Sequence, residues 1–227
     1  MMIPFVEHRF GIQHVEGGLS NISQAMAKVF KEHGGTLHLK SPVDSLLLQG
    51  RKVTGIKVKG KDIHADAVFI NADFAQAMST IAPKRKKYTD KKLESMKYSC
   101  STLMFYWGVD KVYDTPHHNI VFATDYKKNV DAIFKNKQLI DNMSFYMRNA
   151  SVTDKTIAPK GHSALYVLVP VPNLDGNIDW KKATPKIRKE VINALSQHLG
   201  ITELDKHIIK EKIITPPMWR DGYDVYK

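Results

Sequence analysis

Cysteine is almost absent from this chain of 227 residues, and metal-ligand patterns are missing with it. Cys100 is the only cysteine, so the chain can form neither an internal disulfide nor a cluster of thiolate metal ligands. The histidines His117 and His118 are adjacent. In an extended segment their side chains would point to opposite sides and could not chelate one ion. We therefore expect a protein of a reducing compartment that holds no metal.

Long apolar runs are missing as well. The longest, ALYVLVPVP at residues 164–172, is too short to cross a bilayer as a helix. The N-terminus lacks the charged and then apolar order of a signal peptide. These absences predict a cytoplasmic chain without a membrane-spanning segment.

Acidic residues are outnumbered by basic ones, 23 to 34, which gives a formal charge of +11. Such a surface attracts polyanions or the anionic face of a membrane. Many lysines stand in short runs, such as KRKK at residues 84–87, which are typical of solvated helix faces. No aromatic-interleaved basic motif, helix-turn-helix or zinc finger is present, so we expect no nucleic-acid partner.

Nucleotide-binding and hydrolase motifs are absent too. The segment EGGLSN at residues 16–21 has adjacent glycines but lacks the third glycine of a dinucleotide loop and the lysine of a Walker loop. No G-x-S-x-G elbow occurs, and no carboxylate pair can be assigned to acid and base roles. From spacing alone, Gly17 and Gly18 provide backbone freedom for a tight turn before a helix.

Apolar periodicity predicts four helices. In the first, Ile22, Met26, Val29 and Phe30 form one stripe between an N-cap at Ser20 or Asn21 and a stop at Gly34-Gly35. A short helix is expected at residues 74–81 and another at 126–134. The longest is expected to begin with Thr184 as N-cap and Pro185 as first residue, to bury Ile187, Val191, Leu195 and Leu199, and to end at Gly200.

Strand-like segments lie between these helices. The run at 68–70 is apolar throughout and predicts a strand buried on both faces. Large aromatics usually fill sheet cores, so Phe105 and Phe122 are expected there. The order of elements predicts an α+β fold with a mixed sheet. The other expected strands are residues 36–40, 43–49, 53–60, 62–71, 98–109, 119–124, 143–149, 164–171 and 207–215.

Several separated stretches resemble one family, in the same order along the chain. They include GIQHVEGGLSNISQAMAKVFKEHGG, VFINADF, PHHNIVFATDY, SFYMRNASVTDKTIAPKGHSALYVLVPVPNLDGNIDW and IITPPMWRDGYDVYK. Together they are similar to carotenoid desaturases of the bacterial phytoene dehydrogenase type. The phrases YSCS and HNIVF lean towards diapophytoene desaturases, which act on C30 chains rather than C40 chains.

The resemblance implies a two-domain flavoprotein of which this chain is the central piece. Family members are about twice as long and hold FAD with an N-terminal Rossmann segment and a C-terminal segment, and neither has a match here. The chain would then be the substrate-binding region, with flavin-adjacent strands at about residues 9–73, and would be inactive alone. FAD would accept the hydride in the whole protein.

The family likeness also assigns candidate site residues. Those on the cofactor side are Gly17, Gly18, Val43, Asn71, Ala72 and Asp73, although Asp73 could instead cap a helix. Those at the tunnel for a long isoprenoid are Tyr106, Trp107, His118 and Tyr146. No catalytic acid or base is named.

Three hypotheses remain open from the sequence. The chain is part of a carotenoid desaturase, or a standalone module that binds an apolar ligand or lipid, or part of another flavin enzyme such as a carotenoid isomerase, a retinol saturase or an amine oxidase. The first implies peripheral attachment to a membrane, where the substrate dissolves, and contact with the missing FAD-binding segments. Apolar surface left exposed could also drive self-association.

Overall fold

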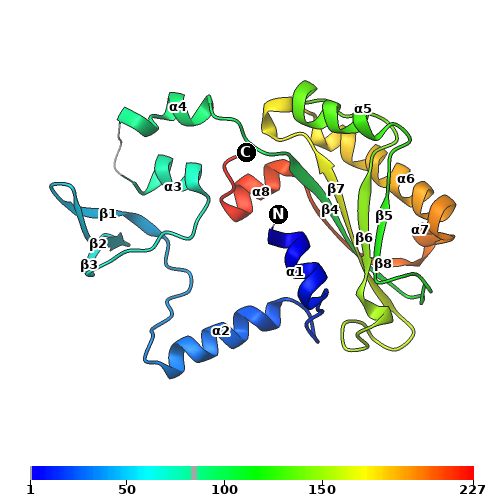
Figure 1. The fold of residues 1–227 in the computed structure, drawn as a ribbon, viewed down its shortest axis with the longest axis horizontal. Coiled ribbons are helices and arrows are strands. Elements are labelled where there is room, and N and C mark those ends of the chain that lie inside the picture. Colours follow the sequence, from blue (N-terminus) through cyan, green and yellow to red (C-terminus); the bar gives the residue numbers. More distant parts are fainter. Residues whose placement is uncertain (1, 83–85) are drawn as a thin grey trace.

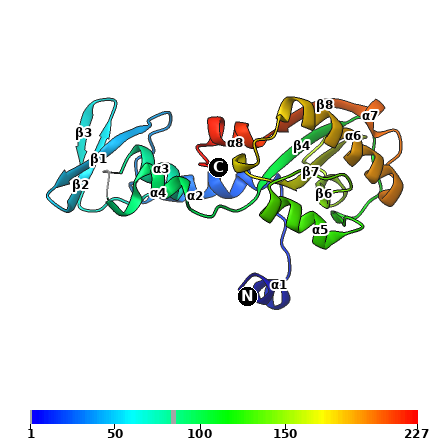
Figure 2. The same ribbon diagram turned by 90° about the horizontal axis from the view of Figure 1, so that it is seen from above.

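The computed structural model describes residues 2–82 and 86–227. It has two lobes, which Figure 2 shows side by side. The smaller lobe contains β1 (Val43–Gln49), β2 (Lys52–Val58), β3 (Lys61–His64), α3 (Phe74–Thr80) and α4 (Asp90–Glu94). The larger lobe contains β4 (Ser101–Val109), β5 (His118–Val121), α5 (Tyr126–Asp131), β6 (Phe145–Asn149), β7 (Ser163–Val171), α6 (Trp180–Leu199), α7 (Leu204–His207), β8 (Ile208–Ile214) and α8 (Pro216–Tyr223).

Two N-terminal helices lie outside these sheets. α1 spans Met2–Phe10 and α2 spans Ser20–Glu32. In Figure 1, α2 runs from the larger lobe towards the smaller one. At 13 residues and 1.5 Å per residue it is about 20 Å long.

Both sheets are antiparallel, which corrects the expected mixed sheet, while the α+β class is confirmed. The larger sheet has the order β5-β6-β7-β4-β8. β7 and β8 are both antiparallel to β4, which separates them, so they run in the same direction without pairing. The order β7, α6, β8 therefore resembles a βαβ unit with two strands of the same direction. The two strands do not pair with each other, because β4 lies between them.

The core lies between one face of this five-stranded sheet and α6. Alternate residues of β7 are buried, and Leu165, Val167 and Val169 are at most 2% exposed. α6 contributes Ile187 and Leu195 to the same cluster. The period of two in the strand and the apolar stripe of the helix meet on this face, as the sequence predicts.

α6 begins earlier than predicted, at Trp180, and its N-cap is Asp179, whose carboxylate accepts from the Lys182 N–H. Pro185 therefore lies inside the helix and not at its first position. Proline removes one backbone hydrogen bond there. The buried stripe of a 20-residue helix offsets that loss. The predicted end is confirmed, since Gly200 has a φ of +65°.

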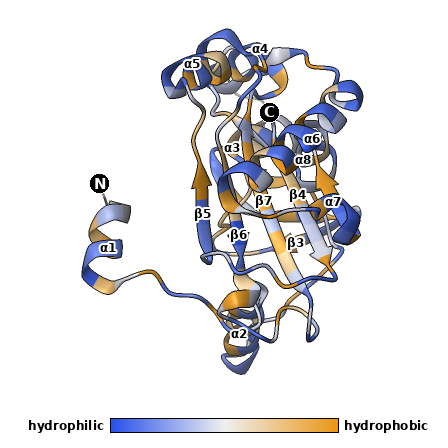
Figure 3. Cartoon of the chain, turned by 90° about the vertical axis from the view of Figure 1, so that its right-hand side faces the viewer, coloured by the Kyte–Doolittle hydropathy of each residue, from blue (hydrophilic) through white to orange (hydrophobic). Residues whose placement is uncertain are grey.

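α2 forms as predicted, but its apolar stripe is not buried within this chain. Met26 is 68% exposed and Phe30 is 51% exposed. Figure 3 shows apolar colour on the outside of this helix. The predicted N-cap is wrong, because Leu19 occupies that place without a side-chain hydrogen bond. The helix ends at Glu32, just before Gly34, as expected.

Two strand predictions in the smaller lobe are wrong. Residues 36–40 and 68–70 belong to no strand, and Phe69 is 96% exposed. An isolated apolar run needs a neighbouring strand for its backbone hydrogen bonds, and these segments have none among the described residues. The remaining predicted strands form, with ends shifted by a few residues. A hairpin joins β2 and β3 through Lys59 and Gly60, both with positive φ.

Candidate functional site

The face of the larger sheet that α6 does not cover carries three tyrosines. Tyr106, Tyr146 and Tyr166 come from β4, β6 and β7, and we call this the tyrosine face. The ring centroids of Tyr106 and Tyr166 are 5.3 Å apart, and those of Tyr146 and Tyr166 are 6.0 Å apart. Both pairs are edge-to-face, the arrangement that aromatic quadrupoles favour. These half-buried rings form a continuous aromatic floor across three strands.

An open hollow of about 410 Å³ lies on this floor. Its lining includes Tyr106, Tyr166 and Ile157, with Arg148 and Lys212 beside them. The Arg148 guanidinium stands 5.8 Å from the Tyr166 ring centroid, and its buried Nε has no hydrogen-bond partner among the described residues. The hollow therefore offers apolar and aromatic area with cationic groups beside it.

Histidines mark one end of the tyrosine face. The Nδ1 of His118 lies 2.6 Å from the Tyr146 hydroxyl, and the two rings stack at 6.0 Å. The rings of His117 and His118 are only 4.4 Å apart, so the prediction that they point to opposite sides is wrong. His117 turns back to share a hydrogen bond with the Thr153 hydroxyl at 2.6 Å, which brings its ring beside that of its neighbour.

The protonation state of this face follows from burial. Burial raises the pKa of the Tyr106, Tyr146 and Tyr166 hydroxyls above their ordinary value. Burial and the neighbouring His118 lower the pKa of His117. At neutral pH the tyrosines are therefore neutral hydrogen-bond donors and not bases.

Trp107 also borders the hollow, but its side chain does not share the tyrosine face. It is 1% exposed and packs in the core beneath α6, stacked on Phe105. Its indole N–H donates to the Glu211 carboxylate, which also accepts from Arg188 Nε at 2.8 Å. Adjacent strand residues point to opposite faces, so Tyr106 and Trp107 cannot line one cavity with both side chains. The structure thus brings together Tyr106, His118 and Tyr146 of the predicted substrate residues and separates Trp107 from them.

The predicted cofactor residues lie in two places. Val43, Asn71 and Ala72 line a cleft of about 500 Å³ in the smaller lobe, whose lining also includes the exposed Phe69. Asp73 caps α3, since its carboxylate accepts from the Gln76 N–H at 3.0 Å. That is the structural role left open by the sequence.

Gly17 and Gly18 lie just before the start of α2, beside the larger lobe. Their φ values are +75° and +97°, so the predicted need for backbone freedom is confirmed. A Cβ on Gly17 would stand 2.5 Å from Asn21 Nδ2, whereas around Gly18 no described atom lies within 4 Å of that position. The backbone of Gly18 is therefore open to a flat group, which fits the approach of a flavin ring.

Asp154 is a residue that no sequence pattern singled out. This buried carboxylate accepts hydrogen bonds from Gly17 N at 2.8 Å and from His14 Nε2 at 2.9 Å. The partners are 137 and 140 residues apart in sequence, and no local pattern could have joined them.

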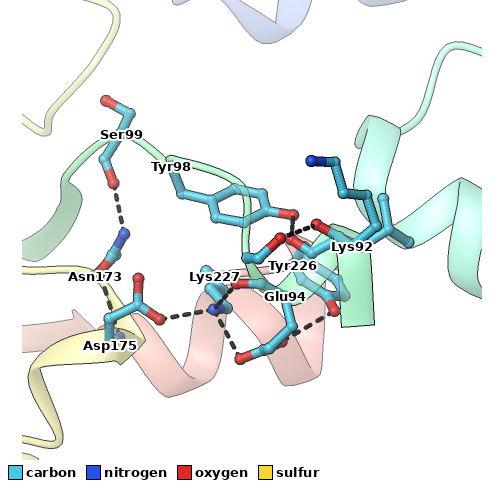
Figure 4. A network of polar contacts seen from close by, with 10 residues as sticks. Lys92, Glu94, Tyr98, Ser99, Asn173, Asp175, Tyr226 and Lys227 are labelled. Atoms are coloured by element: carbon cyan, nitrogen blue, oxygen red, sulfur yellow. Dashed lines mark hydrogen bonds and ion pairs between the residues drawn. The ribbon is translucent and has the colours of Figure 1, made fainter. Parts of the chain in front are cut away.

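A second polar cluster contains Glu94 of α4 and the residues that follow α8, as Figure 4 shows. Lys227 Nζ lies 2.8 Å from Glu94 and 2.7 Å from Asp175, and its side chain is only 8% exposed. The Tyr226 hydroxyl donates to Glu94 at 3.1 Å. These contacts join α4 to the chain that follows α8.

Within residues 2–82 and 86–227, which the structure describes, no group of three or more potential ligand side chains is arranged to hold a metal ion. No helix there combines the length and the apolar character needed to span a bilayer.

Known proteins share parts of this sequence and its fold. Residues 2–113 match the family of flavin containing amine oxidoreductases. An oxidoreductase from Methanosarcina mazei has the same fold over 93% of this chain and 46% of its own, with a TM-score of 0.66 and 17% identity. A protein from Pyrococcus furiosus covers 88% of this chain with a TM-score of 0.59. These two likenesses show that the chain shares their fold.

The chain is also similar over its whole length to carotenoid desaturases, the family that its motifs resemble. It is 48% identical over 229 residues to a 4,4'-diapophytoene desaturase (4,4'-diapolycopene-forming) of Methylomonas sp, covering all of this chain and 45% of that protein. It is 38% identical over 233 residues to an all-trans-zeta-carotene desaturase of Myxococcus xanthus, covering 44% of that protein. The chain therefore spans less than half the length of these relatives.

Proposed function

We propose that this chain is the substrate-holding region of a FAD-dependent desaturase that acts on a C30 or C40 carotenoid precursor. The observation that carries the proposal is the tyrosine face, an aromatic floor on a rigid sheet whose other face is sealed by α6. Diapophytoene is the favoured substrate because the 48% identical relative is a diapophytoene desaturase. The rest of the parent protein would supply the remaining FAD-binding segments.

The two groups of predicted cofactor residues support a cofactor that is long and thin. The cleft at Val43, Asn71 and Ala72 lies in the smaller lobe, whereas the open backbone of Gly18 lies just before α2, beside the larger lobe. FAD carries its adenine and its isoalloxazine at opposite ends. We assign the cleft to the adenosine side and the double glycine to the flavin ring.

Bound FAD would supply the hydride acceptor that no side chain can provide. The residues of this chain then have three tasks. The tyrosine rings hold the flat polyene against the sheet, the apolar core behind them keeps the floor rigid, and the floor excludes water from the reacting carbons. The tyrosine hydroxyls are neutral and add no charge to the floor, although Arg148 and Lys212 stand beside it.

We propose that α5 and its continuation contact the membrane that dissolves the substrate. Phe122 is 63% exposed, and Tyr126, whose ring packs on it at 5.6 Å, is 55% exposed. Phe134 is 46% exposed on the same segment, which also carries Lys128. Exposed aromatics with lysines fit the boundary of an anionic bilayer. The exposure of Phe122 also shows that its predicted place in the core is wrong.

Expression of the longer protein that contains this chain tests the activity. In cells that accumulate either 4,4'-diapophytoene or phytoene, we expect coloured products from the first and less from the second, measured by chromatography with absorbance detection. Purified protein should release FAD on denaturation. Flavin without any change in either precursor would favour another enzyme of the family, and polyene uptake without flavin would favour a standalone binding module.

A further inference from the structure

The carboxylate of Asp154 is the meeting point of two distant parts of the chain. Its side chain is 3% exposed. Oδ2 accepts from Gly17 N and His14 Nε2, as described above, and Oδ1 accepts from the N–H and the hydroxyl of Thr156 at 2.9 and 2.6 Å. With donors on both oxygens, the pKa of Asp154 is held well below its ordinary value, chiefly by Thr156 and His14. Asp154 is thus a fixed acceptor at neutral pH.

This contact attaches the N-terminal segment to the larger lobe. Among the described residues, the hydrogen bonds that join residues 2–42 to that lobe both end on Asp154. The His14 ring adds an edge contact with His117 at 5.0 Å. α2 itself has no buried residue. The place of the double-glycine turn relative to the sheet therefore depends on one carboxylate.

The backbone conformation of the double-glycine turn presents the Gly17 N–H to Asp154. With Gly17 and Gly18 both at positive φ, the Gly17 N–H points out of the chain, where Asp154 accepts it, while the Gly18 N–H closes a turn on Val15 O at 2.9 Å. His14 reaches the same oxygen from the preceding residues. His14, His117 and His118 then lead from Asp154 to Tyr146, so the turn adjoins the histidine end of the tyrosine face.

We propose that Asp154 is a positioning residue that fixes the double-glycine turn at the rim of the tyrosine face and so sets the spacing between the flavin ring and the polyene. This inference rests on the proposed function. Asp154 takes no part in the redox chemistry and acts only by accepting hydrogen bonds from Gly17 N and His14 Nε2. Because both donors bind one oxygen, replacing that oxygen alone should release the turn.

The variant Asp154→Asn tests the attachment in this chain. The new amide can still accept from Thr156 through its oxygen, but its NH₂ then faces the Gly17 N–H, and two donors cannot bond. We expect hydrogen exchange at the Gly17 amide to become faster by about tenfold or more, the factor that corresponds to losing a hydrogen bond to a charged acceptor. The core of β7 should keep its protection.

Asp179→Asn is the matched control. It removes a carboxylate that also caps a backbone N–H, but at the start of α6 and away from the turn. It should leave exchange at Gly17 unchanged. Unchanged exchange at Gly17 in Asp154→Asn, with β7 still protected, would overturn the attachment.

The flavin-loaded longer protein tests the positioning. Asp154→Asn should shift the flavin absorption band and weaken FAD binding by about tenfold, as expected for a lost charged hydrogen bond, while Asp179→Asn changes neither. A released turn with an unchanged flavin spectrum and affinity would overturn the positioning role and leave the desaturase intact. A wild-type protein that binds FAD but desaturates nothing would instead refute the proposed function, and the spectrum would still decide whether Asp154 positions the turn.

Discussion

A single substitution, valine to alanine, should lower the stability of this chain in one helix and leave it almost unchanged in another. Val191 of α6 is 3% exposed, whereas Val29 of α2 is 50% exposed. Each change removes the equivalent of two methylene groups, which is about 1.6 kcal/mol of burial at Val191, at about 0.8 kcal/mol each, and about half of that at the half-exposed Val29. At Val191 the remaining cavity adds about 1 kcal/mol. The higher helix propensity of alanine returns about 0.5 kcal/mol at both sites.

The free energy of unfolding should therefore fall by about 2 kcal/mol in Val191→Ala and change by less than about 0.5 kcal/mol in Val29→Ala. Urea denaturation followed by circular dichroism measures both, with unchanged slopes as the check on two-state behaviour. Equal losses at the two sites would refute the conclusion that the α2 stripe is unburied in this chain. A negligible loss at Val191 would refute the core assigned to α6.

Three further predictions concern pH, association and the second polar cluster. Because the folded pKa of Asp154 lies below its ordinary 3.8, its stabilisation is complete above that value and is lost as pH falls below it, so Asp154→Asn should flatten the acid limb of a stability–pH curve. Met26→Asp should lower self-association in sedimentation experiments without loss of stability, since Met26 is 68% exposed; unchanged association would exclude α2 as the contact. Lys227→Met should remove the ion pairs of Lys227 with Glu94 and Asp175 and destabilise the chain by about 1 kcal/mol in thermal unfolding. An unchanged melting temperature would show that this cluster does not contribute to stability.

Local structure was predictable where neighbouring residues decide it. The helices α2 and α6 with their apolar stripes follow from spacing, and both helices are confirmed, as is the stop of α6 at Gly200. The α6 start was missed because proline is common at first helical positions, whereas here the Asp179 cap lies six residues before Pro185.

Burial and long-range contacts were less predictable. Periodicity shows that a helix has an apolar side but not what covers it, so the stripes of α2 and α6 look alike in sequence and differ in the fold. The same limit explains Phe69, which was expected inside and is almost fully exposed. Asp154 is acidic, flanked by polar residues and far from Gly17 in sequence, so only the fold reveals their contact.

The candidate site was predicted in part. The family likeness pointed to Tyr106, His118 and Tyr146, which the fold brings to one face, but it also named Trp107. Strand alternation alone places adjacent residues on opposite faces, so a choice between Tyr106 and Trp107 was available from the sequence. Tyr166, which joins the other two tyrosines, was not singled out because it lies in a strand that otherwise reads as core.

Equilibrium binding of a C30 polyene to this chain tests the central claim most directly. Tryptophan fluorescence quenching would report affinity for the wild type, for Tyr106→Ala together with Tyr166→Ala, and for Trp107→Phe as the control on the opposite face. We expect saturable binding that weakens about tenfold or more when the tyrosine floor is removed, since each ring contributes about 1 kcal/mol or more of contact, and that is unchanged in Trp107→Phe. Equal affinity in all three proteins would contradict a substrate site on the tyrosine face.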